Sequence, residues 1–357
     1  MPSAFEFGEH RSGAPVTIAV DMMGGDGQAE PEVLVEGVAM AAELYPNVRF
    51  QLFGDAARLS AAAAEEPQLA GRAKVFDAPG IVSQNDKPTE AIRNSTGTSM
   101  GAALDSVADG SAQAAVSCGN TGALMAMSLL KLKRIEGVIR PAIAVLWPTV
   151  TPGKQTVVLD VGADVRMEAR NLAQFAAMGA SFAQIGLGIS WPRVGLLNIG
   201  SEAHKGKPQL QEASTLIREA AIYQDFEYLG FVEPNEIPMD KVDVVVTDGF
   251  TGNVALKAAE GTARLIKTWM KAAFKGSPLA QAGGLLAARA LKEMGRNLDP
   301  SNGNGGVFLG LSGSVVKSHG SVDAAGFCSA VGLAAQIAED RLIQRLAETL
   351  EMTPAAN

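Results

Sequence analysis

The chain has 357 residues, of which 47% are hydrophobic and 19% are charged, and its only cysteines are Cys118 and Cys328. These values indicate a globular protein with a substantial core, and they exclude extensive disorder and a disulfide framework. The formal net charge of −8 argues against nucleic acid as a partner, because phosphate backbones bind basic surfaces.

The first 15 residues contain two glutamates and lack the apolar core of a signal peptide. No run of about 18 uncharged apolar residues occurs, so we expect no membrane span. We expect a cytoplasmic protein in which residues 16–348 form a single catalytic α/β unit, flanked by short tails at 1–15 and 349–357.

Short β-branched runs recur along the chain and predict strands at 16–22, 49–54, 73–78, 113–119, 142–147, 156–162, 193–200 and 242–249. Helical patterns rich in Ala, Leu and Glu lie between most of them, at 30–45, 122–135, 168–187, 209–223 and 252–275. Alternating helices and nearly continuous apolar strands predict a three-layer α/β/α fold with a mostly parallel sheet.

Five predicted strands end alike, in glycine mixed with Asp, Asn, Ser or Glu, immediately before a helix. In open α/β sheets, ligands bind outside the carboxyl ends of the strands, where helix N-termini favour anions. We therefore expect one crest lined by polar side chains, namely Asp21, Asp26, Asn120, Asp160, Asp164, Asn198, Glu202, Asp248 and Asn253.

Known cofactor motifs fit poorly. The segment from Gly25 to Glu30 has a glutamate where a dinucleotide-binding pattern needs its third glycine, and the segment from Gly200 to Pro208 has the wrong spacing for a P-loop. The three histidines are far apart in sequence and no Cys-x-x-Cys occurs, so we expect neither a cofactor nor a metal site. Three carboxylates, Asp21, Asp26 and Asp248, can hold magnesium, or they can instead bond backbone N–H groups in turns.

The segment KSHGS, residues 317–321, precedes a long terminal helix, for which Ser321 is the predicted N-cap and Asp323 lies in the first turn. Lys317, His319 and backbone amides at a helix start suit a phosphate or an oxyanion. A structural histidine and a surface lysine are the alternatives, and Lys205 has the same two interpretations.

Six motifs, in order, resemble the phosphate acyltransferase family of bacterial phospholipid synthesis, and together they span about residues 16–345. They are AVDMMGGD (19–26), SCGNTGA (117–123), LDVGAD (159–164), GLLNIGSEAHKG (195–206), VVVTDGFTGNVALKAAEG (244–261) and GLSGSVVKSHGSVDAAGF (310–327).

The resemblance implies a reaction in which a long-chain acyl-(acyl-carrier-protein) and inorganic phosphate give acyl phosphate and free carrier protein. It also implies a fold similar to phosphotransacetylases and isocitrate-type dehydrogenases, a homodimer, and association with the inner membrane face. An integral-membrane acyl-phosphate:glycerol-3-phosphate acyltransferase is expected to use the product.

This chemistry needs groups that bind anions but no enzyme nucleophile, because phosphate supplies the attacking oxygen. Catalytic roles are expected for Lys317, His319, Asn120 and Asp248, with Lys317 and His319 stabilising charge and protonating the departing thiolate. Substrate binding is expected at Asp21, Gly24, Gly25, Asp26, Gly119, Thr121, Gly122, Asn198, Glu202, Lys205, Gly252, Asn253, Lys257 and Ser318.

The chain departs from the family pattern at three positions. Asp164 stands where Asn is common, Ser201 where an acidic residue is common, and Cys118 where a small residue such as Ala is usual. A carboxylate at 164 would repel phosphate unless a lysine compensates it, so we expect Asp164 to face away from the anion. We interpret Cys118 as a buried small hydrophobe.

A basic helical segment, residues 257–296, contrasts with the acidic chain and predicts an anionic partner such as a carrier protein or a membrane surface. Leucines in the same stretch can lie in the lipid interface or in a dimer contact. The residues expected to contact the membrane or a partner are Lys267, Lys271, Leu279, Leu285 and Leu286.

Three other functions remain open. The first is a coenzyme A-dependent phosphotransacetylase or phosphotransbutyrylase, which shares the chemistry. The second is a non-catalytic membrane scaffold for lipid-synthesis enzymes, and the third, suggested only by the related fold, is a dehydrogenase.

Overall fold

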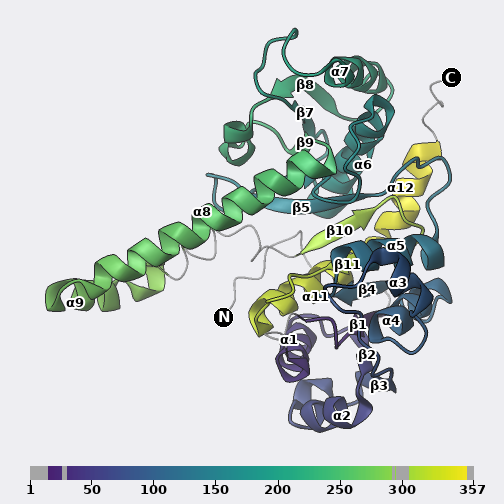
Figure 1. Cartoon of the computed structure of the whole chain (residues 1–357), viewed down its shortest axis with the longest axis vertical. Helices are drawn as coiled ribbons and strands as arrows, with labels where there is room; N and C mark the ends of the chain where they lie inside the picture. The colour runs from purple at the N-terminus through teal and green to yellow at the C-terminus, as the bar shows by residue number, and fades with distance from the viewer. Residues whose placement is uncertain (1–14, 26–29, 292–293, 295–304, 352–357) are drawn as a thin grey trace.

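One eleven-stranded sheet organises the computed structural model, which describes residues 15–25, 30–291, 294 and 305–351. The strand order is β3-β2-β1-β4-β11-β10-β5-β6-β9-β7-β8 (Figure 1). The strands are β1 (Val16–Asp21), β2 (Val48–Gly54), β3 (Ala73–Asp77), β4 (Ala114–Ser117), β5 (Ala142–Pro148), β6 (Gln155–Leu159), β7 (Arg193–Leu197), β8 (Glu227–Val232), β9 (Val244–Val246), β10 (Gly306–Leu309) and β11 (Ser314–Lys317).

Helices cover both faces of the sheet, which confirms the predicted α/β class and its three layers. They are α1 (Pro31–Leu44), α2 (Ala56–Ala64), α3 (Pro88–Arg93), α4 (Ser99–Ala108), α5 (Thr121–Leu132), α6 (Ala169–Leu187), α7 (Pro208–Ala220), α8 (Gly249–Lys275), α9 (Pro278–Leu286), α11 (Ala324–Glu339) and α12 (Leu342–Glu351). Short 3-10 turns occur at η1 (Pro67–Leu69) and η2 (Pro234–Met239).

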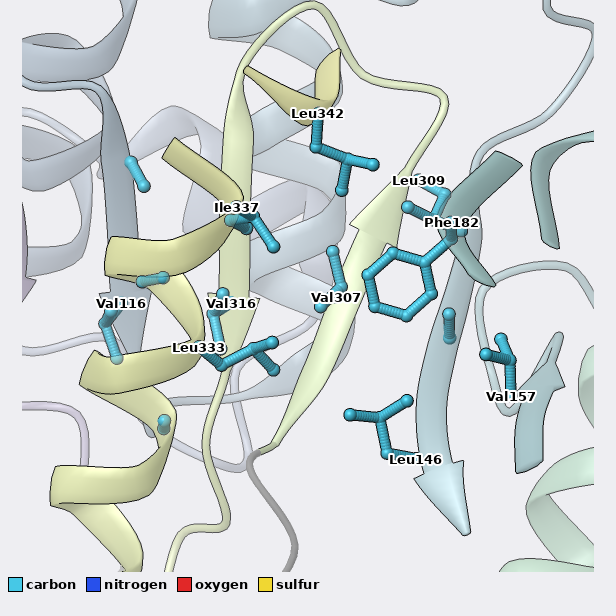
Figure 2. Packing of buried hydrophobic residues seen from close by; sticks show 14 of the residues in the cluster. Val116, Leu146, Val157, Phe182, Val307, Leu309, Val316, Leu333, Ile337 and Leu342 are labelled. Atoms are coloured by element: carbon cyan, nitrogen blue, oxygen red, sulfur yellow. The ribbon is translucent and has the colours of Figure 1, made fainter. Parts of the chain in front are cut away.

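Alternation along the strands divides the core between the two faces. In β1, Ile18 and Val20 pack on the face covered by α1 and α11, whereas Ala19 joins the cluster under α4 and α5. Figure 2 shows the first face, where Leu333 and Ile337 of α11 lie over the sheet. Each such side chain contributes about 1.5–3 kcal/mol by leaving water.

The sheet is mostly parallel, as predicted, but its two halves run in opposite directions. In the described part of the chain, β1, β2, β3, β4 and β11 are mutually parallel, and so are β6, β7, β8 and β9. The two groups are joined through β10 and β5 by three antiparallel pairings. An odd number of reversals makes β6 antiparallel in direction to β11.

The carboxyl ends of β1, β4 and β11 therefore lie at one end of the strands, and those of β6, β7 and β9 lie at the opposite end. We call these two margins of the sheet, which run across the strands, the first edge and the second edge. The expectation of a single crest that gathers all five strand ends is wrong, because a strand of five residues separates its two ends by about 16 Å.

A long helical arm leaves the second edge. Helix α8 begins at Gly249 beside β6 and continues into α9, and Figure 1 shows the pair projecting away from the sheet. Its first turn sits tightly on the backbone, since a Cβ built on Gly252 would lie 1.9 Å from the carbonyl oxygen of Asp160. No described helix is long and apolar enough to cross a membrane.

The seating of α8 can be tested with two glycines of the same helix. Gly252→Ala should lower the free energy of unfolding by about 3 kcal/mol or more, because the added methyl meets immobile backbone. Gly261→Ala is the matched control, since a Cβ there meets no heavy atom within 4 Å and should stabilise the helix by about 0.5–1 kcal/mol. Equal thermal midpoints for the two variants would contradict this packing.

Candidate active site

Three polar residues from adjacent strands lie in register at the first edge. Asp21 of β1 pairs with Ser117 of β4, and Ser117 pairs with Lys317 of β11. Residues in register on parallel strands project from the same face of a sheet, so the three side chains share the face covered by α4 and α5. The geometry thus brings a carboxylate, a hydroxyl and an ammonium together.

The Asp21 carboxylate is fully buried and accepts three hydrogen bonds. Ser99 Oγ donates to Oδ1 at 2.5 Å, Ser117 Oγ donates to Oδ2 at 2.6 Å, and the Met23 amide donates to Oδ1 at 3.2 Å. Burial raises the pKa of Asp21, and the bonds from Ser117 and Ser99, the Met23 amide and the charge of Lys317 act in the opposite direction. These donors offset part of the loss of solvation of the ionised carboxylate, and burial remains the larger effect.

The Lys317 side chain reaches across to the end of β4. Its Nζ donates to the carbonyl oxygen of Cys118 at 3.3 Å, and it also contacts the carbonyl oxygen of Ser318. The Ser318 amide continues the pairing by donating to the Ser117 carbonyl at 2.8 Å. Cys118 itself is completely buried, as predicted, and lies in the core on the α1 and α11 face.

Two glycines allow the backbone segments after β1 and β4 to touch. A Cβ on Gly24 would lie 2.7 Å from Asp21 Oδ2 and 2.7 Å from the Gly119 amide nitrogen, and one on Gly119 would lie 2.4 Å from Met100 Cε. A side chain at position 24 would therefore meet immobile backbone, whereas one at position 119 would first require the flexible Met100 side chain to move. Gly25 is partly buried beside them, while the expected ligand Asp26 lies outside the described residues.

The first edge also carries the N-termini of two helices. Helix α5 follows β4 directly, with Asn120 as its N-cap, and Asn120 Oδ1 accepts from the Ala123 amide at 3.0 Å. Helix α11 follows β11 with Asp323 as its N-cap, so the prediction that Ser321 fills that position is wrong. Helix N-termini attract anions through their unpaired amides and the helix dipole.

Ser321 bonds to His319 instead of capping α11. Its amide donates to His319 Nδ1 at 3.2 Å, and its Oγ lies 2.9 Å from the same nitrogen. Since a backbone amide can only donate, Nδ1 is the acceptor, and the proton of the neutral ring is carried by Nε2. His319 therefore has a hydrogen-bond donor at Nε2.

The Asn120 side chain ties a loop over the first edge. Its Nδ2 donates to the carbonyl oxygens of Ser83, Gln84 and Asp86 at 3.4, 2.8 and 3.2 Å. Gln84 Nε2 in turn lies 3.4 Å from the Gly24 carbonyl oxygen. Both functions of the Asn120 amide are therefore structural, whereas the neighbouring Thr121 and Gly122 are exposed.

The remaining predicted site residues lie at the second edge or on the arm. Asp248 is the N-cap of α8 and accepts from the Phe250 and Thr251 amides at 3.1 and 3.0 Å, while Asn198 donates to the Lys205 carbonyl at 3.0 Å. The others form ion pairs or lie on α8, namely Glu202 with Lys205 at 3.1 Å, Lys257 with Glu260 at 2.9 Å, and Gly252 and Asn253 on the helix.

Asp248 caps α8 at the opposite end of the sheet from the row formed by Asp21, Ser117 and Lys317, so the structure does not support a magnesium ion shared by Asp21 and Asp248. The Asp164 carboxylate is compensated by two arginines, not by a lysine, because Arg166 Nε and Arg140 Nε lie 3.2 and 3.7 Å from it.

Ser99 and Ser117 were missed by sequence reasoning. Ser117 lies in the motif SCGNTGA and directly precedes a glycine-rich turn, a position that could have indicated it. Ser99 is the first residue of α4, 78 positions from Asp21, and only the tertiary fold joins them.

Comparison with known proteins agrees with this architecture. The model of a family described as fatty acid synthesis protein matches residues 16–345. A protein of Paracoccus denitrificans named phosphate acyltransferase is 50% identical over 344 residues, covering 96% of this chain and 92% of that protein. One of the same name from Ruegeria pomeroyi is 50% identical over 332 residues, covering 93% and 89%.

Solved structures show the same fold at low identity. The EutD phosphotransacetylase from Staphylococcus aureus superposes with a TM-score of 0.59 at 14% identity, covering 90% of this chain and 94% of that one. A branched-chain phosphotransacylase from Enterococcus faecalis gives a TM-score of 0.54 at 17% identity, covering 90% and 99%.

Two substitutions separate the roles of Asn120. Asn120→Asp keeps the oxygen that caps α5, but it replaces the Nδ2 donor by a second carboxylate oxygen that repels the three loop carbonyls. Asn120→Ser keeps a capping oxygen but has no amide to donate to the loop. Both should accelerate amide hydrogen exchange across residues 80–88, Asn120→Asp more strongly, and both should lower turnover by about tenfold. Wild-type exchange in this loop would contradict the tether.

Proposed function

The chain belongs to the family of fatty acid synthesis proteins, and we propose that it is a phosphate acyltransferase that transfers a long-chain acyl group from acyl-carrier protein to inorganic phosphate. The observation that carries this proposal is the 50% identity, over more than nine tenths of the chain, to proteins named phosphate acyltransferase. Its place in phospholipid synthesis is part of the same proposal.

The first edge supplies what such a reaction requires. The negative charge of the phosphate nucleophile must be balanced where it binds. The N-termini of α5 and α11 and the Lys317 ammonium provide positive potential there. The buried Asp21 carboxylate, two strands away, acts on that ammonium electrostatically, while the Cys118 and Ser318 carbonyls bond it directly. No enzyme nucleophile is needed, in agreement with the burial of Cys118.

In the proposed mechanism, a phosphate oxygen attacks the thioester carbonyl carbon and forms a tetrahedral intermediate. Lys317 and the helix amides balance the charge on phosphate and on the developing oxyanion. The carbon–sulfur bond then breaks, the carbonyl re-forms as acyl phosphate, and the thiolate takes the proton that the attacking hydrogen phosphate gives up, while His319 Nε2–H donates a hydrogen bond to the sulfur.

Asp248 and Lys205 lie at the second edge, whereas Asn253 and Lys257 lie on α8, which packs on the same face of the sheet as α4 and α5. Their role in substrate binding would involve another part of the acyl donor or the facing edge of a second protomer.

Acyl-carrier protein is favoured over coenzyme A by the basic arm. Helix α8 carries Lys257, Arg264, Lys267, Lys271 and Lys275 on a chain with net charge −8, which provides a local complement for an acidic protein. The chain shares its fold with a phosphotransacetylase. Acyl-coenzyme A is therefore the alternative acyl donor.

The function is tested by supplying phosphate with long-chain acyl-carrier protein or with short-chain acyl-coenzyme A, and measuring acyl phosphate and free thiol. We expect equal amounts of both products from the carrier protein. Lys317→Ala should lower turnover by at least about tenfold, the scale of a lost charge-assisted contact, and Lys74→Ala on the outer strand β3 should not. Exclusive use of acyl-coenzyme A, or thiol release from neither donor, would contradict the proposal.

We further propose that the arm formed by α8 and α9 mediates peripheral attachment to the inner membrane face and contact within a homodimer. Trp269, Leu279, Leu285 and Leu286 are between 66% and 90% exposed on the arm, and Lys267 and Lys271 lie on the same helical stretch as Trp269. An amphipathic segment with basic residues suits an anionic lipid interface. The product would there reach the integral-membrane acyl-phosphate:glycerol-3-phosphate acyltransferase.

Attachment through the arm can be measured with anionic vesicles. Leu285→Glu combined with Leu286→Glu should abolish sedimentation with the vesicles while soluble turnover stays unchanged. Ile222→Glu with Tyr223→Glu is the matched control, because this adjacent apolar pair is 73% and 75% exposed outside the arm. Retained vesicle binding by the leucine variant would assign the arm to contacts between protomers alone.

A further inference from the structure

The Ser99 hydroxyl lies beneath the proposed reacting centre without reaching its surface. Ser99 is 1% exposed, and its Oγ lies 2.5 Å from Asp21 Oδ1. The start of α4 fixes its position, since the Ser99 amide donates to the Gly80 carbonyl at 3.0 Å and the Thr98 side chain caps the helix. The hydroxyl is therefore held rigidly toward the carboxylate.

We infer that Ser99 is a positioning residue, which acts with Ser117 to keep the Asp21 carboxylate ionised and turned toward Lys317, so that the lysine ammonium is held at the end of β11. This inference rests on the proposed function, because it assigns the residues that support its charged group. The two hydroxyls donate to different oxygens of one carboxylate, and Lys317 is in register two strands away.

The groups that act on Asp21 come from four segments. Ser99 on α4, Ser117 on β4 and the Met23 amide after β1 are neutral donors, and Lys317 on β11 is the charged group. Burial favours the protonated acid, and every one of these groups favours the carboxylate. Removing a donor therefore raises the pKa of Asp21 further, and a protonated Asp21 no longer attracts the Lys317 ammonium electrostatically.

The sign of the pH effect follows. Activity that requires the Asp21 carboxylate is lost as pH falls through its pKa, so a higher pKa moves the acid limb of the rate profile to higher pH. A lost hydrogen bond to a charged group corresponds to about one pH unit and about a tenfold lower rate below the shifted limb. Phosphate titrates identically with all variants, so the comparison between variants isolates the protein group.

The experiment measures kcat at saturating substrates against pH for the full-length protein. Ser99→Ala should move the acid limb upward by about one pH unit, Ser99→Thr should restore the wild-type limb because it keeps a hydroxyl, and Asp21→Asn should abolish that limb. Ser106→Ala is the matched control, since Ser106 is a buried serine on the same helix.

An acid limb of Ser99→Ala that coincides with the wild type would overturn the inference, even if this variant were less stable. If Ser99→Ala does not fold, Ser99→Cys carries the same comparison, because a thiol fills the space but is a weak donor. The proposed function fails separately, through absence of acyl phosphate from the wild-type protein.

Discussion

The burial of a carboxylate at the end of β1 constrains the whole first edge of the sheet. An ionised group removed from water is tolerated only when hydrogen-bond donors and an opposite charge replace its solvation. Asp21 meets part of this demand with donors from α4 and β4 and with the charge of Lys317, and burial still raises its pKa. Because these elements come from four separate regions of the sequence, one side chain links the order of the central strands to the placement of the lysine.

The reversal of strand direction through β10 and β5 decides which residues can work together. It leaves α5 and α11 beginning at the first edge beside Lys317, and it turns the ends of β6, β7 and β9 away. The second edge has its own buried carboxylate, Asp160, which accepts from the amides of Ile143, Gly162, Ala163 and Asp164. All the donors to Asp160 named here are backbone amides, whereas two of the three donors to Asp21 are side-chain hydroxyls.

Sequence patterns predicted much of the fold but could not give the direction of its halves. The strands at 16–22 and 142–147 and the helix at 168–187 were evident from β-branched runs and helical patterns. Strands β10 and β11 are four residues each within a glycine-rich stretch, and Gly310, at φ +88°, begins the turn between them. Such short segments show no periodicity, yet their antiparallel pairings decide where Asp248 and Lys205 lie.

Some residues of the candidate site could be predicted from the sequence and others could not. Lys317 and His319 stood out because basic side chains preceded a helix, while Ser99 had no local signal, since its partner is distant in sequence. Asn120 was expected to have a catalytic role, and in the structure its side-chain amide caps α5 and bonds to the carbonyls of Ser83, Gln84 and Asp86.

A structure determined with bound inorganic phosphate or an acyl phosphate tests the central claim most directly. We predict phosphate oxygens within hydrogen-bond distance of Lys317 Nζ and of the first amides of α5, at the ends of β4 and β11. Phosphate held instead at the ends of β6, β7 and β9, beside Lys205 and away from Lys317, would contradict the assignment of the reaction to the first edge.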